Sequence, residues 1–231
     1  MSSSLPTLGS VPDTAPFTIR VAGHADTTAY MNLIAHADPH DPDPFGLARD
    51  ILARHPGRPL SHHRDLCLLA EDSTGTAVGA LLGGVPRWVL EHPGIDTLAL
   101  TDRMISHLGM IHAVAVHPDQ RRRGIGRALI QRAEERFTQA GYGVMTLNHA
   151  PELDGYYRSL GYTVDDALLV HLPPQRLIGM TADDTRMSAK PLRPSVRLAE
   201  VPGAPHRVIT SLLPGASLPP SATFDGTRLQ Y

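Results

Sequence analysis

The segment from residue 111 to residue 127, IHAVAVHPDQRRRGIGR, most constrains what this chain can fold into. It begins as an alternating apolar stretch with three β-branched residues typical of a buried strand, Ile111, Val114 and Val116. His117 and Pro118 end that stretch, and an amphipathic pattern starts near Gly124. The segment therefore predicts a strand that leads through a short turn directly into a helix.

The start of this predicted helix is suited to binding an anion. The first amides of a helix have no partner within it and lie at the positive end of its dipole. Gly124 and Gly126 carry no side chain that would keep a phosphate away from those amides. We therefore expect the amides of residues 121–126 to bind a pyrophosphate. The alternative is a glycine-rich turn without a ligand.

Two motifs in this chain resemble those of the GNAT superfamily of N-acetyltransferases. Arg121, Gly124 and Gly126 fill the acyl-CoA-binding pattern Q/R-x-x-G-x-G/A, between a strand and a helix. Residues 156–162, YYRSLGY, resemble the second motif, a tyrosine followed by x-x-L-G-F/Y. Between the motifs there is room for the family's order of elements: a helix at 125–139, a strand at 143–148 and a short helix.

The resemblance implies the GNAT fold, a mixed α/β (α+β) architecture. Its central sheet is mostly antiparallel, splays at the central strand, where the cofactor enters, and is flanked by helices. The resemblance covers roughly residues 17–172 and is specific over about 108–162. We expect a disordered lead at 1–16, the acetyltransferase domain at 17–172 and a proline-rich extension at 173–231. The extension could pack on the domain, cover the partner subunit of a homodimer, or remain loose.

Periodicity and turn residues predict the elements that surround the motifs. The expected strands are residues 17–21, 65–70 and 77–82, and the last two are joined by a Ser-Thr-Gly turn. Helices are expected at 26–37, 44–54 and about 96–107. The connection at 84–107 is longer than a hairpin needs, which is typical of a functional loop. Strand-like pieces at 195–198 and 207–213 interrupt the extension.

Acetyl transfer to an amine, the reaction that the resemblance implies, needs help with two protons. An ammonium of pKa near 10.4 is free amine in only about one part in 2,500 at pH 7, so a general base is needed. A departing thiolate of pKa near 8.5 benefits from a donor. Tyr157 matches the family's tyrosine near the thioester sulfur and is the predicted donor. The alternative is a packing role, which we expect for Tyr156.

His112 is the candidate general base. Simple alternation along the strand would put its side chain on the face of Val114 and Val116, and an imidazole with pKa near 6.5 suits this task. The strand resembles that of arylalkylamine N-acetyltransferases, in which two histidines relay the proton through water. His112 matches the second of those histidines, whereas Met110 stands at the first. The base could therefore be His112 itself or a water relay.

The resemblance also implies contacts with acetyl-CoA. The backbone of Val114 and Val116 is expected to pair with the pantetheine arm as an added strand would. Arginines near the helix start are candidates for phosphate contacts. Position 150, where the family often has asparagine, is alanine, so nearby Asn148 is the substitute. The expected cofactor-binding set is Val114, Ala115, Val116, Arg121, Arg122, Arg123, Gly124, Ile125, Gly126, Arg127 and Asn148.

The acceptor is expected to arrive over two other segments. A polar cluster between the first two helices could imitate a metal site, but a capped turn is favoured and we expect no metal; it comprises His36, Asp38, His40, Asp41 and Asp43. In the family this turn borders the acceptor pocket, so Asp41 and Asp43 are predicted to attract a cationic amine. Trp88 indicates a small acceptor with an apolar body. Cys67 is expected in the core.

Composition narrows the partners. A net charge of −2 gives no field that points to nucleic acid or a membrane. The single cysteine cannot form an internal disulfide, and the sequence has no long apolar run and no signal-peptide pattern. We therefore expect a cytoplasmic, soluble protein.

The combined prediction is an acetyl-CoA-dependent N-acetyltransferase that moves an acetyl group directly to a primary amine of a small molecule. Transfer to a protein or peptide amine is one alternative. A non-catalytic acyl-CoA-binding sensor or interaction module is the other.

Overall fold

The computed structural model describes residues 17–38, 46–54, 60, 65–181 and 184–231. The lead expected at 1–16 lies outside the described residues. The helices are α1 (Thr27–Ile34), α2 (Gly46–Arg54), α3 (Arg87–Glu91), α4 (Leu98–Ile105), α5 (Ile125–Gln139) and α6 (Asp154–Ser159). The strands up to the second motif are β1 (Phe17–Val21), β2 (Leu66–Asp72), β3 (Ala77–Gly84), β4 (Leu108–Val116) and β5 (Val144–His149). The later strands are β6 (Thr163–Asp165), β7 (Ala167–Leu172), β8 (Arg176–Thr181), β9 (Arg186–Pro191), β10 (Arg197–Ala199), β11 (Val208–Thr210), β12 (Thr223–Phe224) and β13 (Leu229–Gln230).

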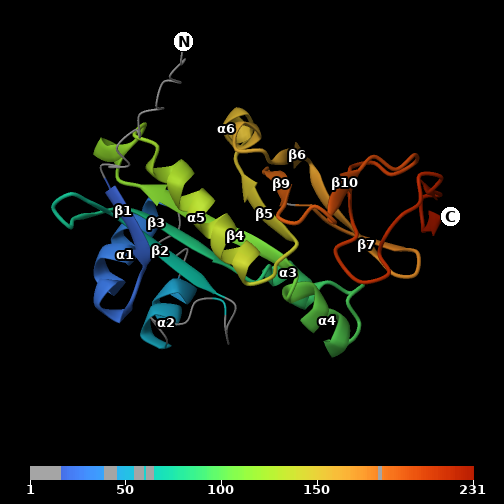
Figure 1. Ribbon diagram of the computed structural model, residues 1–231, viewed down its shortest axis with the longest axis horizontal. Coiled ribbons are helices and arrows are strands. Elements are labelled where there is room, and N and C mark those ends of the chain that lie inside the picture. Colours follow the sequence, from blue (N-terminus) through green and yellow to red (C-terminus); the bar gives the residue numbers. More distant parts are fainter. Residues whose placement is uncertain (1–16, 39–45, 55–59, 61–64, 182–183) are drawn as a thin grey trace, which may run out of the picture.

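A seven-stranded sheet in the order β1-β2-β3-β4-β5-β9-β6 forms the centre of the molecule (Figure 1). Its neighbouring strands are antiparallel except β4 and β5, which are parallel. The predicted mixed α/β fold with a mostly antiparallel sheet is confirmed. The predicted helix at 125–139 has the bounds of α5.

Helices cover both faces of this sheet because alternate strand residues point to opposite sides. One core joins Leu129, Ile130 and Phe137 of α5 to β2 and β3. The opposite core joins α1 and α2 to the other face of the same strands and contains Tyr30 and Cys67. Burying a side chain of the size of leucine or phenylalanine contributes about 1.5–3 kcal/mol, so these two cores hold the sheet that positions the site. Cys67 lies in the core, as predicted.

The sheet opens between its two parallel strands. β4 and β5 pair only from Leu108↔Val144 to Ile111↔Leu147, although β4 continues to Val116. In the pairing of β3 with β4, Leu82 faces Ala113 and Gly83 faces Ile111, so His112 is an extra residue in the described register. Such a bulge bends a strand and increases its twist. The predicted splay at the central strand is therefore present, and a bulge accompanies it.

The chain beyond residue 172 packs against what precedes it. β9 enters the main sheet between β5 and β6, and β7 and β8 form a second sheet in the order β10-β11-β7-β8. A third core joins this second sheet to α3 and α4, and Figure 1 shows the second sheet at the right of the molecule. The expected boundary between the acetyltransferase domain (17–172) and the extension (173–231) thus does not coincide with a boundary between the two sheets.

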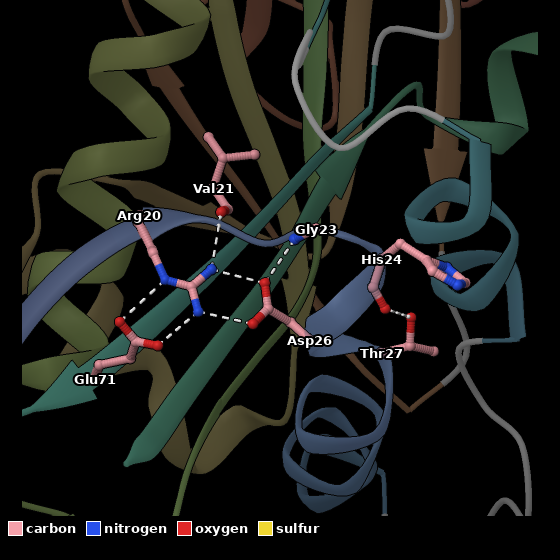
Figure 2. Close-up of polar contacts among 7 residues, drawn as sticks. All are labelled: Arg20, Val21, Gly23, His24, Asp26, Thr27 and Glu71. Atoms are coloured by element: carbon pink, nitrogen blue, oxygen red, sulfur yellow. Dashed lines mark hydrogen bonds and ion pairs between the residues drawn. The ribbon is translucent and has the colours of Figure 1, made fainter. Parts of the chain in front are cut away.

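One arginine joins the start of α1 to the edge of the main sheet (Figure 2). Arg20 on β1 donates to both carboxylate oxygens of Asp26, each at 2.7 Å, and to both of Glu71, at 2.6 and 3.0 Å. Asp26 also accepts the backbone N–H of Gly23 at 2.7 Å. The hydrogen bonds from Arg20 lower the pKa of Asp26. Bidentate, charge-assisted contacts of this kind fix the geometry of both partners.

Each helix in the described part of the chain is too short or too polar to span a bilayer.

Candidate active site

The open side of β4 presents backbone groups toward the split. Successive peptide groups of a strand point to opposite edges. The N–H of His117 donates to the carbonyl of Val78 on β3 at 2.9 Å, so the peptide groups of Ala115 also point to β3. Those of Val114 and Val116 point away from β3, toward the split. This is the orientation that an added strand-like ligand requires.

The turn after β4 brings consecutive amides to the start of α5. Arg122 has φ +62° and Gly124, the N-cap of α5, has φ +82°. Left-handed residues in such a turn aim neighbouring amides at one point, which favours an anion. A Cβ on Gly124 would meet nothing within 4 Å, so this side of the turn is open. The turn is therefore compatible with the pyrophosphate binding that we expect of residues 121–126.

The arginine side chains around this loop differ in their contacts. Arg121 donates to the carbonyl of Val116 at 3.2 Å, Arg123 donates to Gln120, and Arg127 donates to Ser159 of α6 at 3.2 Å. Arg122 is exposed and pairs with none of the described side chains. Arg122 is thus the arginine of this loop that is most available to a phosphate, and the other three brace the loop.

Tyr157 is the buried member of the tyrosine pair on α6. Only 8% of it is exposed, and within the described part of the chain no residue hydrogen bonds to its hydroxyl. Burial, together with the neighbouring Tyr156, raises its pKa to about 12. The phenol is therefore protonated at neutral pH and can donate a hydrogen bond. Tyr156 is 36% exposed, so the packing role predicted for it under the sheet is wrong.

His112 lies at the bulge of β4, which interrupts the simple alternation used to assign its face. Ile111 and Val114 both contact the core beneath α5, although side chains three residues apart on a regular strand point to opposite faces. The bulge at His112 therefore shifts the in–out alternation of side chains by one residue. Burial and the cationic Arg87 lower the pKa of His112 to about 4, although a backbone hydrogen bond with Val85 raises it. The imidazole is therefore neutral at pH 7 and available as a proton acceptor.

The predicted acceptor residues are described only in part. Asp41 and Asp43 lie outside the described residues. Trp88 is half-buried against the core of the second sheet, with its ring centroid 5.9 Å from that of His92. Its buried indole Nε1 has no hydrogen-bond partner among the described residues. Asn148, the predicted cofactor contact on β5, has an exposed side chain.

In the part of the chain that the structure describes, one group of side chains has ligand atoms close enough for a metal ion. Oxygen and nitrogen atoms of Asp165, Asp166 and His206 lie within 4.8 Å of one another. His206 Nδ1 is 2.6 Å from Asp165, and Arg186 forms an ion pair with Asp166. Arg186 of β9 thus already pairs with one of the two carboxylates, and we interpret the group as an ion-pair network that links β6, β9 and the segment before β11.

His149, the last residue of β5, is a site residue that the sequence-based prediction does not contain. It is 6% exposed and its ring lies 4.5 Å from that of Tyr157, between centroids. Met145 and Leu147, which precede it on the same face of β5, belong to the core beneath α5. The sequence signal for His149 is that it continues the alternation of apolar residues along this strand, directly before the second motif.

Comparisons with known proteins agree with this geometry. The family model described as "Acetyltransferase (GNAT) domain" matches residues 64–164. An acetyltransferase of Sodalis glossinidius is 31% identical over 116 residues, which is 49% of this chain and 68% of that protein. An acetyltransferase of Pectobacterium atrosepticum is 32% identical over 114 residues, which is 48% of this chain and 67% of that protein.

Solved structures share the fold at low sequence identity. A GNAT superfamily phosphinothricin acetyltransferase from Sinorhizobium meliloti, solved in complex with acetyl-CoA, has a TM-score of 0.50 and 17% identity. That match covers 76% of this chain and 88% of the other. Ard1 from Thermoplasma volcanium has a TM-score of 0.50 and 16% identity, covering 76% of this chain and 97% of the other. The family match, the two relatives and the shared fold together show that the chain belongs to the GNAT superfamily of acetyltransferases, enzymes that use acetyl-CoA as the acyl donor.

Proposed function

We propose that this protein is an N-acetyltransferase that moves an acetyl group directly from acetyl-CoA to a primary amine of a small molecule. The observation that carries the proposal is the connection between its two motifs at the open end of the sheet. Arg127 on α5 donates to Ser159 on α6, and the Tyr156 hydroxyl lies against Gly126. The anion-binding turn and the tyrosine motif therefore form one continuous site.

The residues around the split fit acetyl-CoA, which supplies the acetyl group as a thioester. The amides of residues 121–126 would hold the pyrophosphate, with Arg122 as the available side chain. The outward backbone groups of Val114 and Val116 would pair with the pantetheine amides. A pantetheine bound there would run along β4, between the bulge at His112 and the start of α5.

His112 and Tyr157 divide the proton chemistry. His112, neutral because of its low pKa, accepts the proton that the amine loses as its nitrogen becomes acylated. Tyr157 donates a hydrogen bond to the departing thiolate. A thiolate of pKa about 8.5 is a weaker base than a phenolate of pKa about 12. Tyr157 therefore stabilises the thiolate mainly by hydrogen bonding rather than by complete proton transfer.

The acceptor is proposed to be small because α3 and α4 fill the connection that precedes β4. These helices and Trp88 belong to the third core, so the connection is folded against the second sheet and is not an open loop. Asp41 and Asp43 are proposed to attract the cationic form of the amine.

The test is release of free thiol from acetyl-CoA with a panel of amines: arylalkylamines, polyamines, aminoglycosides, amino acids and a lysine peptide. Amine-dependent release by the parent, with turnover about 10²-fold lower in Tyr157→Phe and acetyl-CoA affinity little changed, is the expected result. Acetyl-CoA binding without release across the panel would instead support a non-catalytic sensor. An unaltered rate in Tyr157→Phe would remove that residue from its role.

A further inference from the structure

His149 is held in one orientation by hydrogen bonds at both ring nitrogens. Nδ1 is 2.8 Å from the carbonyl oxygen of Ala150, and Nε2 is 2.9 Å from Ser188 Oγ. Because a carbonyl oxygen only accepts, Nδ1 carries a hydrogen, and in the neutral ring Nε2 accepts from the Ser188 hydroxyl. Ser188 is itself fully buried at the centre of β9. The ring therefore has no free rotation about its χ angles.

This fixed ring forms the surface on which Tyr157 rests. The planes of the two rings are inclined by 30° with centroids 4.5 Å apart, a tilted contact at the short end of the range for interacting aromatic rings. Tyr156 and Tyr162 contact Tyr157 at steeper angles, 71° and 80°, and larger distances, 5.1 and 5.9 Å. His149 thus supports one flat face of the phenol, and the two tyrosines limit its lateral movement.

We propose that His149, locked by Ser188, is a positioning residue that aims the Tyr157 hydroxyl at the leaving sulfur; this rests on the proposed role of Tyr157 as donor. Both nitrogens of His149 are engaged and its ring lies against that of Tyr157, so it acts through orientation and not by exchanging a proton with Tyr157. Displacements of about 1 Å at a reacting group can cost about 10²-fold in rate. A support that fixes the phenol therefore affects turnover more than cofactor binding.

The experiment combines a double-mutant cycle with a measurement made without cofactor. His149→Leu removes the ring and both hydrogen bonds, His149→Phe keeps a flat ring, and Ser188→Ala releases only Nε2. We expect kcat to fall roughly tenfold or more in His149→Leu, less in Ser188→Ala, and to recover partly in His149→Phe, with KM for acetyl-CoA changed by less than about threefold. In the Tyr157→Phe background, His149→Leu is expected to lower kcat by less than about twofold.

The second readout is the NMR signal of the Tyr157 ring in the tyrosine-labelled, cofactor-free protein. One set of signals is expected in the parent and in His149→Phe, and exchange-broadened or multiple signals in His149→Leu. His171→Leu is the matched control, because His171 on β7 is a buried histidine with Nδ1 3.0 Å from the Ala216 carbonyl and its ring 6.1 Å from that of Tyr231. It should leave kcat within about twofold of the parent.

The outcomes separate the two proposals. If Tyr157→Phe alone leaves kcat unchanged, the donor role of Tyr157 fails and the positioning role fails with it. If Tyr157→Phe lowers kcat but His149→Leu lowers it equally in both backgrounds, or leaves the Tyr157 ring signals as in the parent, the donor role stands and the positioning role of His149 is overturned.

Discussion

The hydroxyl oxygen of Tyr156 lies 3.2 Å from the position that a Cβ atom on Gly126 would occupy. The residue before the tyrosine of the second motif thus closes over the last glycine of the first motif. Because Val116 Cγ2 lies 3.7 Å from the same position, the first turn of α5 is enclosed between β4 and α6. At Gly126 a side chain is restricted by the close approach of Tyr156 and not by the backbone conformation, unlike at Gly124.

Gly126→Ala is expected to weaken acetyl-CoA binding with little loss of stability. The added methyl would displace the Tyr156 hydroxyl and narrow the anion-binding turn, and we expect KM for acetyl-CoA to rise about tenfold, or about 1.4 kcal/mol. The higher helix propensity of alanine, worth up to about 1 kcal/mol, offsets the cost in folding. Gly155→Ala in α6 is the control, since its Cβ would meet nothing within 4 Å. Equal KM values in the two variants would contradict the enclosed turn.

The low pKa of His112 makes stability depend on pH. Its folded value of about 4 is below the ordinary 6.5, so the unfolded chain binds the proton more readily. The stability contributed by neutral His112 is present in full above pH 6.5 and is lost as the pH falls toward 4. Chemical denaturation across this range should show a shallower loss for His112→Gln than for the parent. His24→Gln, on the exposed residue before α1, should follow the parent.

Charge repulsion from Arg87 accounts for part of the lowered pKa of His112. Arg87→Gln is expected to raise the pKa of His112 without restoring its ordinary value, because burial, the larger cause, remains. An NMR titration of the His112 ring protons measures this directly, and the exposed Arg197 on β10 provides the control variant Arg197→Gln. An unchanged titration midpoint in Arg87→Gln would show that the guanidinium is screened from the imidazole.

The sequence predicted local features of this site better than its long-range ones. The bounds of α5 follow from the glycines of the turn and from apolar residues that recur every 3.6 positions. Both signals are contained within the segment itself. The face of His112 was assigned by simple alternation, but the bulge opposite Leu82 and Gly83 depends on how β4 pairs with β3. Alternation within one strand contains no information about such an extra residue.

The environment of His149 was equally inaccessible to local patterns. Its partner Ser188 comes from β9, which enters the sheet between β5 and β6 about forty residues after β5. The segment of β9 is buried at three consecutive residues, Met187, Ser188 and Ala189, so it shows no alternation of apolar and polar residues. A strand enclosed on both faces is hard to distinguish from an irregular segment by its pattern alone.

Arg20→Gln is expected to loosen the start of α1. The side chain of Arg20 is 42% exposed, so its two ion pairs are partly screened and we expect a loss of about 1 kcal/mol in the free energy of unfolding. High salt should reduce the difference from the parent. Arg132→Gln removes a pair with Glu135 at similar exposure, 43%, but only within α5, and should cost less than about 0.5 kcal/mol. Equal losses in the two variants would contradict a special role for the doubly bidentate arginine.

The buried phenol of Tyr157 sets the alkaline behaviour. Its folded pKa of about 12 exceeds the ordinary 10.0, so the folded protein holds the proton more tightly than the unfolded chain does. The corresponding stability is present in full below pH 10 and is lost as the pH rises toward 12. Denaturation between about pH 9 and about pH 11 should therefore show a steeper loss for the parent than for Tyr157→Phe. Tyr231→Phe, at a residue that is 48% exposed, serves as control and should behave as the parent. The same shift keeps the donor protonated, so turnover should not decline near pH 10 through ionisation of Tyr157. A decline there that disappears in Tyr157→Phe would mean that the phenol ionises at its ordinary pKa and is open to water.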